Sequence, residues 1–241
     1  MITTFLELKM LKNFNIHNLS QSLDWWLNFI NSVGRNYIVS ESTLKLPIAE
    51  FLETINKSDL ELEYNHPEFS TRRIDLFFKD IVNDKAIAFE FKYINQNSTL
   101  KKSEKQRILN DLMRLKLFPN NDKKTYFIIC GNTDYFNSYF QRIKSPSKKL
   151  TTQNNDRFIS YGFYNKWFSF DLKNPVRKIQ LNHKNKNYNV LYKDFERVYL
   201  TPLNKNNLMP IYLETQLIYL SPDISIKYTL AGTKLGVWEV L

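Results

Sequence analysis

The sequence contains few of the residues that build disulfide frameworks, zinc sites and disordered chains. Its one cysteine, Cys130, excludes an intramolecular disulfide framework and a zinc site built from cysteines. Cys130 lies in the apolar run TYFIICG, which favours a small buried core residue in a reducing compartment. The three histidines, His17, His66 and His183, are far apart and lack the spacing of zinc ligands. With 5 glycines and 8 prolines, the chain is not expected to be disordered or collagen-like.

Long apolar runs and two common catalytic motifs are also missing. No stretch approaches the roughly 20 apolar residues that span a bilayer. The N-terminal MITTFLELKMLKNF lacks the apolar core and cleavage site of a secretory signal. We therefore expect a cytoplasmic protein that does not enter a membrane. Neither the phosphate-binding loop G-x-x-x-x-G-K-[ST] nor a serine nucleophile elbow occurs, which argues against a P-loop ATPase and against that type of serine catalysis.

Basic residues are abundant in this chain. The 34 lysines and arginines outnumber the 24 aspartates and glutamates, which gives a net charge of +10. Such a charge favours a polyanionic partner, nucleic acid before membrane. A genome biased toward Asn and Lys would produce the same composition, so this alternative stays open. A chain of 241 residues that is 43% hydrophobic can form one large domain, or a main domain with an appendage.

Hydrophobic periodicity predicts an α/β chain. One apolar stripe holds Leu23, Trp26, Leu27 and Ile30 in a segment that Gly34 would end, which is typical of an amphipathic helix. The run KKTYFIICG is continuously apolar, as expected for a central strand covered on both faces. The crossover helix before it implies at least one parallel strand pair. The expected elements are helices over 18–34 and 42–57, a strand over 60–64, two strands over 72–94, a helix over 103–118, a strand over 123–131 and a helix over 133–144.

Three regions follow from this order of elements. Residues 1–36 are expected to form an N-terminal helical segment, and residues 37–150 the α/β core. Residues 151–241 are β-rich, and we expect them to form either an extension of the sheet or a small second lobe. Their strand-like pieces lie at 164–172, 187–192, 210–220 and 234–241.

Two charged strands stand out in the stretch RRIDLFFKDIVNDKAIAFEFKYI, residues 72–94. Charges on apolar strands are costly to bury without partners. Because strand side chains alternate between faces, Glu90 and Lys92 share one face about 7 Å apart. If the strands form a hairpin with a two-residue loop, Asp75 lies opposite Lys92 and diagonal to Glu90. A three-residue loop would break this arrangement unless a bulge restored it.

This arrangement of charges suggests a cation site. Two carboxylates at one sheet edge repel each other, and a divalent cation between them removes the repulsion. Hard oxygen ligands favour Mg²⁺ or Mn²⁺ over zinc. Such an ion can activate water and stabilise charge on a phosphate, and Lys92 could hold the attacking water or neutralise the developing charge. The alternative is a cross-strand Asp–Lys–Glu ion cluster on a half-exposed sheet.

The surrounding sequence, from about residue 40 to 118, resembles the PD-(D/E)XK nuclease superfamily, in particular its restriction-endonuclease-like members. The resemblance lies in the run SESTLKLPIAEFLETINKSDLELEYN, the I-D strand, the E-F-K strand and the helix sequence NDLMRL. It implies a restriction-endonuclease-like core, in which helices flank a mixed β-sheet, with a β-rich C-terminal extension. The proline that often precedes the first aspartate of the family is absent, because Ile74 stands there.

The resemblance also implies roles for individual residues. Asp75 and Glu90 would bind Mg²⁺ or Mn²⁺ with the main-chain carbonyl of Phe91, and Lys92 would be the catalytic lysine. Glu41 matches the helix carboxylate that the family often adds.

The position of Glu41 leaves two alternatives open. Pro47 would kink a helix that had already begun at Glu41, so Glu41 could lie in a turn instead. Glu63 is the alternative acidic residue. Glu50 is expected on the far side of the helix, about 200° from the inward stripe.

Basic residues cluster around the crossover helix. One interpretation makes them phosphate contacts that flank the site, with Gln106 aligning the scissile phosphate. The other is a solvated helix face. The residues concerned are Lys101, Lys102, Lys105, Gln106, Arg107, Arg114 and Lys116.

The sequence thus predicts a metal-dependent nuclease, a Mg²⁺-dependent phosphodiesterase in a restriction, defence or repair role. DNA is favoured over RNA as its substrate, and a homodimer is one option for its assembly. The alternative is a non-catalytic module that binds nucleic acid or protein and keeps a nuclease-like scaffold. A third hypothesis is an unrelated α/β function with a surface ion cluster.

Overall fold

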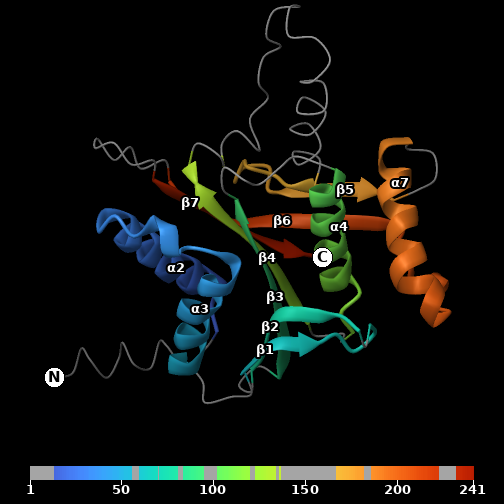
Figure 1. Ribbon diagram of the computed structural model, residues 1–241, viewed down its shortest axis with the longest axis horizontal. Coiled ribbons are helices and arrows are strands. Elements are labelled where there is room, and N and C mark those ends of the chain that lie inside the picture. The colour runs from blue at the N-terminus through green and yellow to red at the C-terminus, as the bar shows by residue number, and fades with distance from the viewer. Residues whose placement is uncertain are drawn as a thin grey trace, which may run out of the picture.

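The computed structural model describes residues 14–55, 60–69, 71–80, 84–94, 102–119, 123–133, 136, 167–181, 186–222 and 232–241. Within these ranges the chain forms a seven-stranded sheet with helices packed on both faces (Figure 1). This confirms the predicted α/β class and the mixed sheet flanked by helices.

The strands follow the spatial order β1-β2-β3-β4-β7-β6-β5. Strands β3 and β4 are parallel, joined by a crossover that contains a helix, and the other neighbouring pairs are antiparallel. In β4, seven consecutive residues are buried, as its continuous apolar run predicts. The strands are β1 (Leu60–Asn65), β2 (Arg73–Asp80), β3 (Lys85–Ile94), β4 (Lys124–Asn132), β5 (Val176–Gln180), β6 (Tyr212–Leu220) and β7 (Thr233–Val240).

Two N-terminal helices have clear sequence boundaries. Helix α2 (Ile16–Ser32) begins where the side chain of Asn15 accepts hydrogen bonds from the main chain of the first turn. It ends before Gly34, whose φ of 70° lies in the left-handed region that favours glycine. Helix α3 (Glu41–Ile55) starts at Glu41 and continues through Pro47.

The two faces of the sheet carry different helices. On one face, α2 and α3 pack their leucines against Phe89 and Phe91 of β3. On the other, α4 (Lys102–Lys116) and α7 (Lys186–Phe195) pack against Ala88 of β3 and Trp238 of β7. Short helical turns complete the described fold: η1 (Asn36–Ile38), the π-helical η2 (Glu196–Leu200), η3 (Thr201–Leu203) and η4 (Asn206–Leu208).

The C-terminal region differs from the sequence prediction in several places, and one of them is β5 (Val176–Gln180), which lies outside the predicted pieces. Residues 187–192 are helical, within α7, because Leu191 and Phe195 are buried one turn apart against α4. Six residues are too short a window to separate helix from strand by periodicity. The described part of 164–172 is not a strand either, although Trp167 and Phe168 are buried in the core. The predicted helix over 133–144 lies almost entirely outside the described residues.

The remaining C-terminal strands join the same sheet as the core. β7 pairs with β4 and β6 pairs with β7, so residues from both ends of the chain share one hydrophobic interior. Asp24 of α2 contributes to this junction, because its carboxylate accepts hydrogen bonds from the hydroxyl groups of Tyr219 (2.8 Å) and Ser221 (2.6 Å).

Candidate functional site

Charged side chains from α3, α4 and the first three strands meet where β2 begins and β3 ends. We call this group the charged cluster. It contains six carboxylates but only three cations, so it carries an excess of negative charge when all are ionised. Its members are Glu41 and Lys45 of α3, Glu63 of β1, Asp75 of β2, Glu90 and Lys92 of β3, and Glu104, Asp111 and Arg114 of α4.

The charged cluster forms where β2 separates from β3. The backbone pairing of the two strands ends at Leu76 and Phe89. Beyond that point the Phe91 main-chain N–H donates to Asp75 Oδ2 over 2.8 Å, and the Tyr93 N–H donates to Glu41 Oε1 over 3.4 Å. Two carboxylates therefore take the place of a neighbouring strand along the open edge of β3.

The register of β2 and β3 differs from the predicted hairpin. Asp80 pairs with Lys85, so the strands are shifted by two residues relative to a two-residue loop. Continuing the observed register places Asp75 level with Glu90 rather than Lys92. A two-residue shift keeps every side chain on its own face, which is why the hydrophobic pattern alone could not distinguish the two registers.

Asp75 also lies at the point where the side chains of β2 change the face of the sheet to which they point. Leu76 and Phe78 pack in the core beneath α2 and α3, whereas Ile74 packs in the core beneath α4. Strict alternation along a strand would place all three side chains on one face. Because the strand changes side at this point, Asp75 can reach Lys45 of α3 as well as Glu90.

Lys92 is held between two carboxylates from different helices. Its Nζ lies 2.9 Å from Glu41 Oε1 and 3.0 Å from Glu104 Oε1, and the residue is only 8% exposed. Burial alone would lower the pKa of Lys92, but Glu41 and Glu104 raise it above the ordinary value. Lys92 is therefore a protonated cation at neutral pH and not a base.

The cation on Asp75 is Lys45, which the sequence interpretation did not single out. Lys45 Nζ lies 2.9 Å from Asp75 Oδ1 and also bonds to Glu63. Burial acts to lower the pKa of Lys45, and the two carboxylates raise it. One signal was available, since Lys45 follows Glu41 by one helical turn and so shares its face of α3.

Glu90 is the most buried carboxylate of the charged cluster, at 2% exposure. Arg114 binds its Oε1 through Nη2 (2.6 Å) and Nε (3.0 Å), and the same Nη2 lies 2.8 Å from Asp111 Oδ1. Burial raises the pKa of Glu90 well above its usual range; the positive charge of Arg114 opposes this rise, and the negative charges of Asp111 and Asp75 add to it. Burial also raises the pKa of Asp111 to about 6.

The residues expected to bind phosphate around α4 have different surroundings, and they do not form one group of exposed basic side chains. Arg114 turns inward to Glu90, as just described. The Gln106 amide donates to Asn110 Oδ1 and to the Leu191 carbonyl, both at 2.9 Å, so it joins α4 to α7. Arg107 is exposed, 3.9 Å from Glu104. Lys105 is half-buried, Lys102 begins α4, and Lys101 lies outside the described residues.

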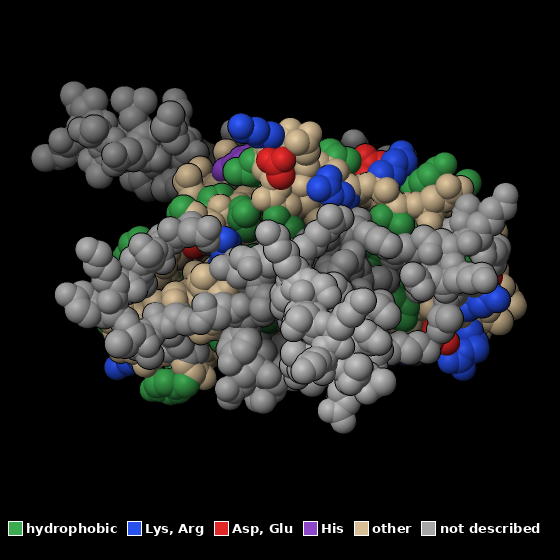
Figure 2. Space-filling view, turned by 90° about the horizontal axis from the view of Figure 1, so that it is seen from above, with side chains coloured by type: hydrophobic (Ala, Val, Ile, Leu, Met, Phe, Trp, Pro, Cys, Tyr) green, Lys and Arg blue, Asp and Glu red, His purple; other side chains and the backbone are tan. Residues whose placement is uncertain are grey.

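Figure 2 shows no large basic patch among the described residues of the face in view. On the face seen in Figure 2, the Lys and Arg side chains that are coloured occur in small separate groups, some beside an acidic side chain. The net charge of +10 is therefore not gathered at a single place on the described part of that face.

The fit to a divalent cation rests on two carboxylates. Among the described residues, no group of three or more His, Cys, Asp or Glu is arranged to hold a metal ion. Mg²⁺, however, is commonly bound through one or two carboxylates together with water and substrate phosphate. The negative charge of Asp75 contributes to the raised pKa of the buried Glu90 carboxyl, and a cation between the two carboxylates would relieve this repulsion. This donor set fits Mg²⁺ or Mn²⁺ and does not fit zinc.

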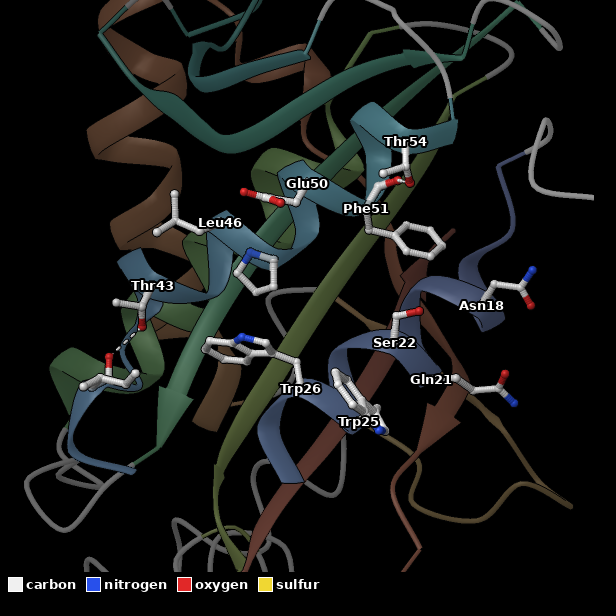
Figure 3. Close-up of a pocket in the computed structure, with 12 residues that line it drawn as sticks. Asn18, Gln21, Ser22, Trp25, Trp26, Thr43, Leu46, Glu50, Phe51 and Thr54 are labelled. Carbon is white, nitrogen blue, oxygen red and sulfur yellow. Dashed lines mark hydrogen bonds between the residues drawn. The ribbon is translucent and has the colours of Figure 1, made fainter. Parts of the chain in front are cut away.

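A groove lies between α2 and α3. It has a cavity volume of about 1010 Å³, and Trp26 of α2 and Phe51 of α3 project into the space between the helices (Figure 3). Among the described residues that line it, Glu50 is the single charged one. A lining in which these residues supply one carboxylate and no cation is poorly suited to a phosphate backbone.

The described helices include none long and apolar enough to cross a membrane. Comparison of the chain with protein-family models, curated proteins and solved structures found no match.

Proposed function

We propose that this chain is a metal-dependent nuclease that hydrolyses phosphodiester bonds, with DNA as its substrate, on a restriction-endonuclease-like core. The observation that carries the proposal is the position of Asp75 beside Glu90 at the point where β2 and β3 separate, with the Asp75 carboxylate held by the Phe91 N–H of β3. Two neighbouring carboxylates, one of them 2% exposed, are unfavourable unless a proton or a cation compensates their charge.

The carboxylates would hold the ion in a fixed geometry. Mg²⁺ or Mn²⁺ bound by Asp75, Glu90 and the Phe91 carbonyl would supply Lewis-acid stabilisation and a more acidic bound water. The Phe91 N–H fixes Asp75 Oδ2, and Arg114 fixes Glu90 Oε1. Both carboxylates are therefore positioned from β3 and α4 before any substrate arrives.

Lys92 would contribute a positive charge to the reaction. Because Glu41 and Glu104 keep it protonated, it can stabilise the negative charge that develops on the phosphate oxygens, but it cannot accept a proton from water. Glu41 acts by orienting Lys92, since one of its oxygens contacts both the Lys92 ammonium and the Tyr93 N–H.

A second candidate is a non-catalytic module that binds nucleic acid or protein on the same scaffold. The observation that favours it is that Asp75 and Glu90 already have ion pairs, with Lys45 and Arg114 respectively. A cluster whose charges are compensated by the protein itself can be purely structural.

Cleavage of supercoiled plasmid, with and without Mg²⁺ or Mn²⁺, tests the proposal. The wild-type protein is expected to nick or linearise the plasmid only with metal. The Lys92→Ala variant should be slower by about 100-fold or more, because a preorganised charge at the reacting phosphate is lost. Glu50→Ala, on the other side of α3, is the matched control and should cleave normally. Metal-independent DNA binding without cleavage by the wild type would instead support the second candidate.

A further inference from the structure

Asp75 and Glu90 are each held by a cation from a different helix. Lys45 of α3 contacts Asp75 Oδ1 at 2.9 Å, and both bonds of Arg114 end on Glu90 Oε1. The two helices lie on opposite faces of the sheet. The cations therefore approach the carboxylate pair from two sides.

The combined charge of the Lys45 and Arg114 side chains equals the charge of the divalent cation that Asp75 and Glu90 would bind. Lys45 and Arg114 together contribute +2, the same as one Mg²⁺ or Mn²⁺. They are also largely withdrawn from solvent, with side-chain exposures of 11% and 13%, so water screens their effect only weakly. A divalent ion and these two cations cannot all be compensated by Asp75 and Glu90 alone.

Each cation has a second carboxylate within reach. Lys45 also bonds to Glu63, and Arg114 Nη2 also lies 2.8 Å from Asp111 Oδ1. If an ion took over Asp75 and Glu90, neither cation would be left as an uncompensated buried charge, which is the outcome that makes breaking a buried ion pair costly. The exchange needs no change in fold.

We propose that Lys45 and Arg114 are built-in counter-ions that compete with the divalent cation for Asp75 and Glu90. They keep the metal affinity of the free protein low, and they move onto Glu63 and Asp111 when the ion binds. This inference rests on the proposed metal-dependent nuclease, because it concerns the same pair of carboxylates.

Direct titration with Mn²⁺ in the absence of nucleic acid, followed by calorimetry, tests the competition. Lys45→Met and Arg114→Gln should each bind Mn²⁺ about tenfold or more tightly than the wild type, as removal of a neighbouring cation strengthens cation binding by a carboxylate. Lys124→Met is the matched control and should leave the affinity unchanged, because Lys124 pairs with Glu239 outside the charged cluster. Circular dichroism checks that each variant is folded, and Lys45→Met carries the test if Arg114→Gln is not.

The possible results separate this inference from the proposed function. Equal affinities in wild type and variants, with intact metal-dependent cleavage, would overturn the competition and leave the nuclease proposal standing. Weaker binding in the variants would also overturn it, since the cations would then position the ligands. If neither the wild type nor any variant binds Mn²⁺, and the plasmid is not cut, both proposals are wrong.

Discussion

Two faces of helix α3 flank the one that packs on the sheet, and they differ in chemistry. One carries a buried lysine and the other an exposed leucine, at neighbouring positions of the chain. Lys45 is 9% exposed, and Leu46, the next residue, is 60% exposed. This inverts the usual rule that lysine stays in solvent and leucine is buried. Lys45 joins the charged cluster, whereas Leu46 lines the groove shared with α2.

The contrast indicates which features of α3 serve folding and which do not. A third face, with Leu44, Ile48 and Leu52 all fully buried, packs on the sheet and follows the expected helical spacing. The buried lysine and the exposed leucine contribute little to that packing. Departures from local folding rules are expected at functional sites, so both flanking faces of α3 are candidates for function.

Truncating the buried leucine of this helix should have the largest effect. We expect Leu44→Ala to lower the free energy of unfolding by about 3 kcal/mol, because it removes buried methyl groups and leaves a cavity. Leu46→Ala should change it by less than about 0.5 kcal/mol, since its side chain is already in solvent. Urea denaturation followed by circular dichroism measures both. Equal losses would mean that the groove face belongs to the folding core.

Much of this arrangement could be anticipated from the sequence. Periodicity predicts α3, the mixed sheet and the long buried strand β4, because these depend on local patterns of apolar residues. The same patterns predict that Glu50 faces away from the inward stripe, and it lines the groove.

Features that depend on contacts between residues far apart in the sequence could not be predicted from local patterns. The contacts of Lys45 with Asp75 and of Arg114 with Glu90 join residues far apart in the chain, and a single charged residue leaves no periodic signal. The register of β2 and β3 depends on the length of their connection. Helix α7 depends on packing against α4, which outweighs the strand-like look of NYNVLY.

The buried side chain of His66, beside the charged cluster, should make the free energy of unfolding depend on pH. This effect is smaller than that of Leu44→Ala. His66 is 1% exposed, its Nδ1 accepts the Glu68 N–H, and its Nε2 lies 2.9 Å from the Arg114 carbonyl. Burial lowers the pKa of His66 to about 4, below its ordinary value of 6.5. The stabilisation it provides is therefore present above pH 6.5 and is lost as the pH falls toward 4.

Comparison of wild type with His66→Gln isolates this effect. Between pH 7 and pH 5 the wild type should lose about 2 kcal/mol more unfolding free energy than the variant, because only the unfolded wild-type chain gains a proton on His66. The pKa of Asp111, raised by burial to about 6, acts in the opposite direction, but it is common to both proteins. Urea titrations at the two pH values give the difference, and parallel pH dependence in the two proteins would show that His66 has the same pKa in the folded and unfolded chains.

The smallest effect is expected on the groove side, at Trp25 of α2. Trp25 is 69% exposed and stacks on Phe29, whose ring centroid is 5.8 Å away. Loss of this exposed aromatic contact in Trp25→Ala costs little, and the higher helix propensity of alanine offsets part of it, so the free energy of unfolding should change by less than about 0.5 kcal/mol. Urea denaturation of the variant beside Leu44→Ala provides the comparison. A loss above about 2 kcal/mol would place Trp25 in the folding core, and the exposed apolar face of the groove would then need no functional explanation.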